Sequence, residues 1–377
     1  MDFGFEKKYD MAKTLFKEFT ENEVEPLAQE IDENEAFPKA TVEKMAKYGF
    51  LGIPVSKENG GQGCDYLTYV LCVEELAKKC GSTAAVLTAH TVVANDVVFE
   101  YGTPAQKEAY GAALAKGEKL GAAAILDADG KAVTAELVDD EYVLNGTKNY
   151  VLNGEAADVF VVTAVTGMIE KNGRQKPEVS AFLIDKETAG LTVGAKQRTL
   201  GTKGAGTCPV TFDGCRVPQT SLLSAKGKGD VVLNHILDCA RIGVAAQALG
   251  IAEGALDKTS NYVQERKQFG VPIGFFQNTR AQLAEMSANI EAARLLVYKA
   301  AVARATARTY SQEAATAKLI AARTATSVTR EAVQLHGGYG YMREYDVERM
   351  MRDAKAAEVH EGSAEAQLMT IFRSAMK

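Results

Sequence analysis

Three segments in the last third of the chain concentrate side chains that could do chemistry: ERKQFG at 265–270, QLHGGYGY at 334–341 and MRDAKAAEVHEGSAEAQ at 351–367. The last one contains a carboxylate, Glu361, directly before a glycine. A carboxylate works as a general base when a water-poor pocket raises its pKa toward the working pH. Taken alone, Glu361 is better interpreted as a solvated loop carboxylate ahead of a helix that Ser363 caps.

Metal and disulfide chemistry are disfavoured by the cysteines and histidines. The six cysteines show no CxxC spacing and no matching histidine pair, which argues against a zinc site and fits reduced thiols in the cytoplasm. They are Cys64, Cys72, Cys80, Cys208, Cys215 and Cys239, and the histidines are His90, His235, His336 and His360.

Length and composition exclude several classes of protein. At roughly 150 residues per domain, 377 residues predict two or three structural units, and 46% hydrophobic residues are enough for a globular core. The net charge is −6, from 43 basic and 49 acidic side chains, so the surface would repel phosphate backbones and anionic headgroups. The sequence offers neither a secretory h-region nor a run of about 18 apolar residues. We expect no nucleic-acid or membrane partner.

The elements that position the motifs begin with helices. Apolar residues recur with a helical period in 10–30, 40–48 and 66–79, and Pro26 is expected to end or kink the first helix. Thr103, which precedes a proline, is the expected N-cap of a further amphipathic helix.

Strands replace helices near residue 121. The segment 141–152 alternates around Asn145-Gly146, a dipeptide that favours a type I′ hairpin turn. A small antiparallel barrel or sandwich fits the spacing of the following strands. These are expected at 159–165, 179–184, 191–195 and 210–217.

The final region is helical again. Between Phe275 and His336 there is no Gly and no Pro, which indicates long packed helices in a bundle. The predicted fold is therefore α+β. It has an N-terminal α domain (1–120), a middle antiparallel β domain (121–225) and a C-terminal four-helix-bundle domain (226–377).

The three motif segments each resemble a signature of the acyl-CoA dehydrogenase flavoproteins. Other segments match the same family in order and spacing, namely GIPVSKENGGQG, VEELAKK, YGTPAQKEAY and LDCARIGVAAQALGIAEGA. The resemblance therefore covers nearly the whole chain, and it favours the short-chain butyryl-CoA or acryloyl-CoA type.

The resemblance implies a chemistry. Oxidising an acyl thioester between its α and β carbons needs a base for the α-proton and an acceptor for a hydride, which FAD supplies because no side chain can. Glu361 matches the family's base, and Gly362 would let the backbone approach the thioester. Some relatives place the base before the arginine that is here Arg241, but this chain has Ala240 there.

The resemblance also implies binding residues. Arg266 matches an arginine that reaches across a dimer interface to the flavin pyrophosphate, which its planar fork of donors suits; a surface arginine is the alternative. Asp238 and Arg241 match positions that meet the acyl-CoA, although an i,i+3 ion pair fits them equally. The other implied FAD-binding residues are Gln268, Phe269, Gln277, Gln334, Gly337, Gly338, Ser363, Glu365 and Tyr150.

Three of these positions have simpler alternatives. Phe269 could pack in the core, and the pair Gly337-Gly338 could form an ordinary turn. His360 stands where most relatives have tyrosine; beside Glu361 its titration near neutral pH could alter the pKa of the base, or it could simply pack the pocket wall.

The middle domain departs from the family. Relatives carry a stretch close to Thr-Glu-Pro-x-Ala-Gly-Ser-Asp that contacts flavin and substrate, whereas this chain has ILDADGKAV at 125–133. Where relatives have Trp-Ile-Thr, this chain has Tyr150-Val151-Leu152, so Leu152 cannot donate a hydrogen bond to the flavin. If the loop lies near the pyrimidine ring, Asp127 and Asp129 would oppose the charge of a reduced flavin. We expect weaker flavin retention or a lower potential.

Two functional hypotheses follow. The first is an FAD enzyme that interconverts a short acyl-CoA and its 2-enoyl-CoA, exchanges electrons with an electron-transfer flavoprotein and assembles as a dimer of dimers. The second is a non-catalytic or half-site subunit of a hetero-oligomer with impaired flavin binding. Glu361 favours the enzyme, because a redundant subunit would have little chemical need for it.

Overall fold

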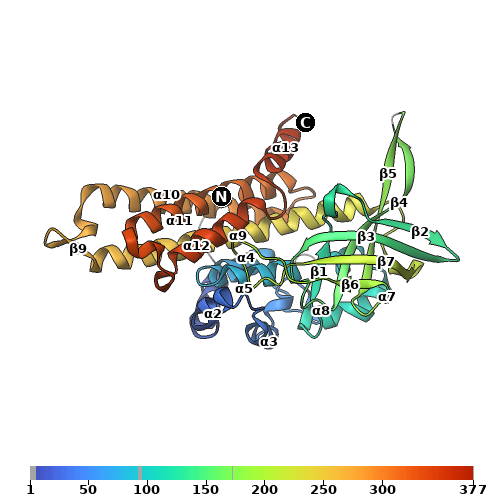
Figure 1. Cartoon of the computed structure of the whole chain (residues 1–377), viewed down its shortest axis with the longest axis horizontal. Helices are drawn as coiled ribbons and strands as arrows, with labels where there is room; N and C mark the ends of the chain where they lie inside the picture. Colours follow the sequence, from blue (N-terminus) through green and yellow to red (C-terminus); the bar gives the residue numbers. More distant parts are fainter. Residues whose placement is uncertain (1–5, 92–95, 172, 377) are drawn as a thin grey trace.

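The computed structural model describes residues 6–91, 96–171 and 173–376. Helices from both ends of the chain form one elongated body, and the sheet lies at one end of it (Figure 1). The C-terminal helix projects away from the long axis of this body. This arrangement confirms the predicted α+β architecture.

The N-terminal region is helical, as predicted. Within the described residues, its α-helices are α1 (Lys7–Phe19), α2 (Ala28–Glu33), α3 (Lys39–Lys47), α4 (Tyr66–Ala77), α5 (Gly81–Thr88), α6 (Asp96–Tyr101), α7 (Pro104–Gln106) and α8 (Ala112–Lys116). A π turn and a 3-10 turn separate α1 from α2 around Pro26, which confirms the kink. Thr103 caps α7 in a capping box with Gln106.

The middle region forms one mixed sheet. Its strands are β1 (Gly121–Ala124), β2 (Thr134–Val138), β3 (Glu141–Val151), β4 (Val159–Lys171), β5 (Arg174–Asp185), β6 (Leu191–Val193), β7 (Cys208–Pro218) and β8 (Leu222–Leu223). They run in the order β6-β7-β3-β2-β4-β5-β8, with β1 beside β4. The antiparallel prediction holds except that β1 and β2 run parallel to β4.

The predicted hairpin turn at Asn145-Gly146 is wrong. This dipeptide lies inside β3, where the pairing with β7 shifts register, and the Asn145 side chain accepts a hydrogen bond from the Gly214 amide at 2.8 Å. The dipeptide thus lies opposite a bulge of β7, where Asp213 and Gly214 face the single residue Asn145, and it forms no turn. The chain instead reverses at Asp139 and Asp140, whose φ angles of 51° and 65° are left-handed at both turn positions.

The C-terminal region contains the long helices. It comprises α9 (Gly229–Glu265), a hairpin of β9 (Lys267–Gln268) and β10 (Val271–Pro272), α10 (Gln277–Thr306), α11 (Ser311–His336), a 3-10 turn at Gly337–Tyr341, α12 (Val347–Val359) and α13 (Ala364–Ala375). The helices α9, α10 and α11 pack along one another and confirm the predicted bundle.

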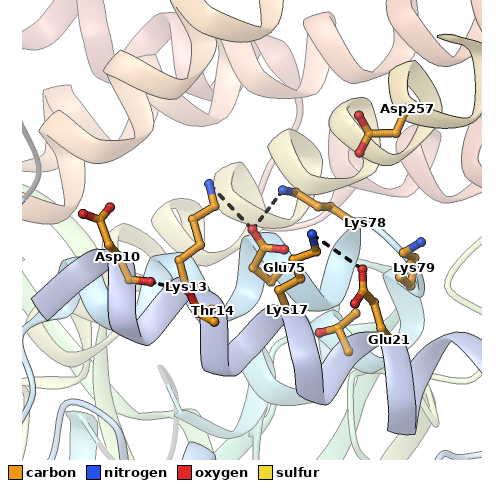
Figure 2. Close-up of a pocket in the computed structure, with 10 residues that line it drawn as sticks. Asp10, Lys13, Thr14, Lys17, Glu21, Glu75, Lys78, Lys79 and Asp257 are labelled. Carbon is orange, nitrogen blue, oxygen red and sulfur yellow. Dashed lines mark hydrogen bonds and ion pairs between the residues drawn. The ribbon is translucent and has the colours of Figure 1, made fainter. Parts of the chain in front are cut away.

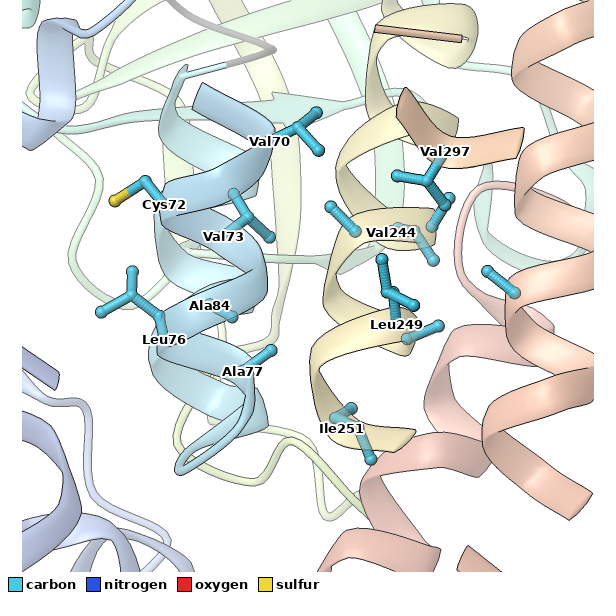
Figure 3. Packing of buried hydrophobic residues seen from close by; sticks show 14 of the residues in the cluster. Val70, Cys72, Val73, Leu76, Ala77, Ala84, Val244, Leu249, Ile251 and Val297 are labelled. Carbon is cyan, nitrogen blue, oxygen red and sulfur yellow. The ribbon is translucent and has the colours of Figure 1, made fainter. Parts of the chain in front are cut away.

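A close contact between α4 and α9 joins the two helical regions. Val70, Val73 and Ala77 of α4 face apolar residues of α9 across the interface (Figure 3). A Cβ atom at Gly250 would lie 2.1 Å from the Glu74 backbone oxygen, and one at Gly254 2.2 Å from the Lys78 oxygen. Glycine at these two positions therefore allows the helices to approach this closely.

His90 connects the helices to the sheet. Its ring is buried, with Nδ1 accepting a hydrogen bond from the Gly121 amide at 3.1 Å and Nε2 lying 3.0 Å from the Leu114 carbonyl oxygen. The neutral Nε2–H tautomer satisfies both partners. Burial lowers the pKa of His90 to about 4, so the folded protein resists protonating this ring.

We expect His90 to make the fold sensitive to acid. Because its folded pKa of about 4 lies below the ordinary 6.5, the neutral ring contributes stability above pH 6.5, and about 3 kcal/mol of it is lost as the pH falls toward 4. Urea unfolding midpoints of wild type and His90→Gln at several pH values measure this difference. The variant should be weaker at pH 7 and closer to wild type at pH 4; a constant gap would contradict the assignment.

Candidate active site

Glu361 lies in the loop between α12 and α13, in a strained conformation. Its φ of 54° is left-handed, as is that of Gly362 at 96°, and a non-glycine residue there needs support from its surroundings. Two buried side chains give it. Gln367 Nε2 donates to the carbonyl oxygens of Glu361 and Gly362 at 3.0 and 3.1 Å, and Lys318 Nζ donates to that of Gly362 at 2.6 Å.

The charges and the burial around the Glu361 carboxylate suit a general base. Loss of solvent around the Glu361 carboxylate raises its pKa, and the positive charges of Arg241 and Lys318 oppose this rise without cancelling it. Arg241 is only 8% exposed. An apolar surrounding that raises the pKa and nearby cations that preserve a carboxylate fraction are what a general base needs at neutral pH.

The i,i+3 ion pair between Asp238 and Arg241 forms. Arg241 Nη1 donates to Asp238 Oδ1 at 2.8 Å, and Ser311 donates to the other carboxylate oxygen. Within the described residues Arg241 Nε has no hydrogen-bond partner. A buried, partly unsatisfied guanidinium next to Glu361 is consistent with a role toward an anionic or carbonyl group of a ligand.

Of the two alternatives for His360, the structure favours packing over titration near neutral pH. Burial and the positive charge of Lys318 lower its pKa to about 4, so the ring stays neutral at pH 7. His360 adjoins Glu361 and is partly buried, which leaves packing of the wall as its role. Its titration therefore cannot tune the base near neutrality.

A pocket of about 530 Å³ lies at the opposite end of the bundle. No heavy atom lies within 4 Å of a Cβ built at Gly337 or Gly338, so both backbones face open space. The Arg266 guanidinium lies 5.4 Å from the centre of the Tyr339 ring, in a cation–π contact. The predicted FAD-binding residues that line this pocket are Arg266, Gln268, Gln334, Gly337 and Gly338.

The chemistry of this pocket fits a dinucleotide. A guanidinium fork, two amide side chains and two bare glycine backbones are donors suited to a pyrophosphate. Phe269 is 95% exposed, so the alternative that it packs in the core is wrong. Gln277, which begins α10, is also exposed on this side of the bundle.

Within one chain, however, the predicted cofactor residues fall into two separate groups. Lys318, which contacts the Glu361 loop, and Gln334, which lines the pocket, are 16 residues apart on α11, or about 24 Å at 1.5 Å per residue. Ser363 and Glu365 are exposed at the Glu361 end. Tyr150, at the end of β3, is 59% exposed with a left-handed φ of 54°.

The 125–133 loop is electrostatically milder than expected. Asp127 accepts hydrogen bonds from the Lys148 ammonium at 2.6 Å and from the Val133 amide at 3.1 Å. Because the ammonium of the almost fully buried Lys148 offsets the charge of Asp127, we expect a weaker opposition of Asp127 to a reduced flavin than the sequence alone implies. Asp129 is exposed. Leu152, in contrast, has no hydroxyl, so the expectation that it cannot donate a hydrogen bond to the flavin is unchanged.

A polar groove of about 500 Å³ between α1, α4 and α9 contains none of the predicted site residues (Figure 2). Its lysines are all paired: Lys13 and Lys78 with Glu75, Lys17 with Glu21, and Lys79 with Glu25. Each of these lysines thus already has a carboxylate partner, so the groove offers no unpaired lysine to an anion.

Within the described residues, no cluster of His, Cys, Asp or Glu could hold a metal ion. All six cysteines are free. One stretch, Gly81–Tyr101, is long and apolar enough to cross a membrane, but 86% of it is buried inside the protein, and part of it lies outside the described residues. A core helix passes the same test.

Comparisons with known proteins identify the family of this chain. Family models of acyl-CoA dehydrogenase match in three consecutive parts: the N-terminal domain at residues 6–118, the middle domain at 125–215 and the C-terminal domain at 227–376. A short-chain specific acyl-CoA dehydrogenase of Clostridium acetobutylicum is 44% identical over 98% of both chains. This chain belongs to the acyl-CoA dehydrogenase family.

Two further similarities refine the placement in the acyl-CoA dehydrogenase family. An acryloyl-CoA reductase (NADH) of Anaerotignum propionicum is 42% identical over 100% of this chain and 96% of its own. The structure of butyryl-CoA dehydrogenase from Megasphaera elsdenii superposes with a TM-score of 0.95, at 37% identity over 100% of both chains. The resemblance to the short-chain type is confirmed.

Sequence reasoning missed two residues that this acyl-CoA dehydrogenase uses to hold the loop, Gln367 and Lys318. A signal for Lys318 was present. It is the lysine in the alanine-rich stretch EAATAKLIAA, and it shares a helical face with Ala314, Ala321 and Ala325, all of them buried. A lysine on an otherwise apolar face is expected to have a specific partner.

Proposed function

We propose that the protein catalyses the FAD-dependent α,β-dehydrogenation of a short-chain acyl-CoA, or the reverse reduction of a 2-enoyl-CoA. The observation that carries this is Glu361: in a member of the acyl-CoA dehydrogenase family, it is a carboxylate in a strained, supported turn, with a raised pKa and two cations beside it. Electrons would be exchanged with an electron-transfer flavoprotein in the cytoplasm.

This chain's residues would act as follows. The Glu361 carboxylate removes the α-proton of the thioester, and its own amide N–H, with Gly362 leaving room, stabilises the charge that develops on the thioester oxygen. Arg241 and Asp238 orient the acyl-CoA. When bound, FAD accepts the β-hydrogen as hydride.

We infer that a second copy of the chain completes the cofactor site. The residues suited to a pyrophosphate lie about 24 Å along α11 from the Glu361 loop, and the family resemblance implies an arginine that crosses a dimer interface. Arg266, Gln268, Phe269, Gln277, Gln334, Gly337 and Gly338 would then serve the partner's FAD, while Tyr150, Ser363 and Glu365 serve the chain's own. A dimer of dimers is the assembly we propose.

The visible spectrum of the purified protein tests the activity. We expect a yellow FAD-loaded protein that bleaches under anaerobic addition of butyryl-CoA and releases the 2-enoyl-CoA. Colourless protein that becomes active only with a paralogous chain would instead support the half-site subunit. Yellow protein that no short acyl-CoA bleaches would refute the proposed reaction.

Leu152 gives a prediction about flavin affinity. It occupies the place where relatives carry a threonine that donates to the flavin, so Leu152→Thr should restore one hydrogen bond. A hydrogen bond to a charged group contributes about 1.5 kcal/mol, and about 1.4 kcal/mol changes a dissociation constant tenfold. We therefore expect FAD to bind Leu152→Thr about tenfold more tightly than the wild type. Equilibrium titration of apoprotein with FAD measures this, with Leu152→Val as the size-matched control. Equal affinities of the two variants would count against the donor.

A further inference from the structure

Lys318 is a buried ammonium without a carboxylate partner. Lys318 is 1% exposed and shares its face of α11 with the buried residues Ala314, Ala321 and Ala325. Among the described residues, no carboxylate oxygen lies within the 4.0 Å of an ion pair. Most buried lysines in proteins are paired with an acid, so this one requires another explanation.

Its hydrogen bonds point to the loop that carries Glu361. Lys318 Nζ donates to the Glu358 carbonyl oxygen at 3.0 Å and to the Gly362 carbonyl oxygen at 2.6 Å. The first acceptor lies in the last turn of α12, at the negative end of the helix dipole, where a cation is favourable. The second follows Glu361 directly. One ammonium thus bridges the two sides of the residue whose backbone is left-handed.

We propose that Lys318 is a positioning residue for Glu361: its ammonium fixes the turn from α12 to α13 in the strained conformation, and its charge favours the ionised form of the carboxylate. The inference rests on the proposed role of Glu361 as the base. It differs from the role of Gln367, which donates from α13 to the carbonyl oxygens of Glu361 and Gly362 and carries no charge.

The charges around Glu361 support the electrostatic part. Arg241 faces it from α9, but Asp238 already pairs with that guanidinium. On α12 the Glu358 side chain pairs with Lys355, and His360 is neutral because burial lowers its pKa to about 4. Glu365 of α13 is exposed. Among the described residues, Lys318 is therefore the buried cation beside Glu361 that no carboxylate pairs. Burial lowers its pKa to about 8, but it is still mainly protonated at pH 7. The other cation of α11 on this side, Arg323, is exposed and acts on Glu365.

Two substitutions separate the two roles. Lys318→Met nearly keeps the length of the side chain but removes donor and charge, whereas Lys318→Gln removes the charge and keeps an amide donor on a side chain that is one atom shorter. Arg349→Met is the matched control, since Arg349 is a buried cation on α12 that donates to the Lys79 carbonyl oxygen, far along the helix from the loop. For each protein, kcat/KM for butyryl-CoA against pH and amide hydrogen exchange of residues 359–364 are measured.

We expect Lys318→Met to lower kcat/KM about 10- to 100-fold at pH 7, as misplacement of a reacting group does, and to move the acidic limb of the profile up by about one pH unit. Its 359–364 amides should exchange about tenfold faster or more. Lys318→Gln should show the same shift of the pH profile but a smaller increase in amide exchange. Arg349→Met should change neither the pH profile nor the amide exchange of residues 359–364.

An unshifted pH profile and wild-type loop exchange in Lys318→Met would overturn the proposal, even if its stability fell. Should that variant not fold, an unshifted profile in Lys318→Gln would do the same. A wild-type protein that turns over no acyl-CoA would refute the proposed function instead, while the exchange measurement would still test the positioning of the loop.

Discussion

Glu361→Gln is expected to lower kcat for butyryl-CoA dehydrogenation at least about 10³-fold, because general base catalysis contributes typically 10² to 10⁴ and no second base is placed at Ala240. The amide has the same shape as the carboxylate, so the turn held by Gln367 and Lys318 is preserved. The rate of anaerobic flavin bleaching in stopped flow measures the loss. FAD binding should be unchanged.

The matched control for this variant is Glu358→Gln. It removes a carboxylate three residues away whose side chain pairs with Lys355, and it leaves the Glu358 carbonyl oxygen in place for Lys318. We expect at most a few-fold change. Undiminished bleaching in Glu361→Gln would mean that the mechanism proposed for this site is wrong.

Arg266→Ala is expected to weaken FAD binding about 100-fold, because two charge-assisted hydrogen bonds of a guanidinium fork are lost at about 1.5 kcal/mol each. The effect should be on the partner's cofactor, since Arg266 lines the pocket at the far end of α11 from Glu361. Arg280→Ala is the matched control, because Arg280 packs over Phe275 and does not line that pocket.

Mixed assemblies test the exchange of residues between chains. Arg266→Ala and Glu361→Gln proteins are each expected to be nearly inactive, but unfolding and refolding them together should form sites that combine one chain's Glu361 with the other's Arg266. About a quarter of wild-type activity should return, since half of the dimers are mixed and each has one intact site. Failure to recover activity in demonstrably mixed dimers would place both residues in the same chain's site.

The helices and most strands were predictable from the sequence because their signals are local. Proline at position 26, the Thr103 cap and the glycine-free stretch 275–336 each act within a few residues of themselves. The predicted turn at Asn145-Gly146 failed for the opposite reason: the dipeptide is also compatible with a strand, and pairing with β7, which bulges opposite Asn145, placed it inside β3. The boundaries at 120/121 and 225/226 stay a prediction.

The site divides in the same way. The sequence by itself determined which residue types are present at Glu361, Arg266 and the Gly337-Gly338 pair, because these motifs are contiguous in the chain. Only the tertiary structure decided that they lie at opposite ends of α11, that Lys148 neutralises Asp127, and that Lys318 bridges the turn at Glu361. Contacts between residues distant in sequence depend on how whole helices and strands pack, and no local pattern encodes that packing.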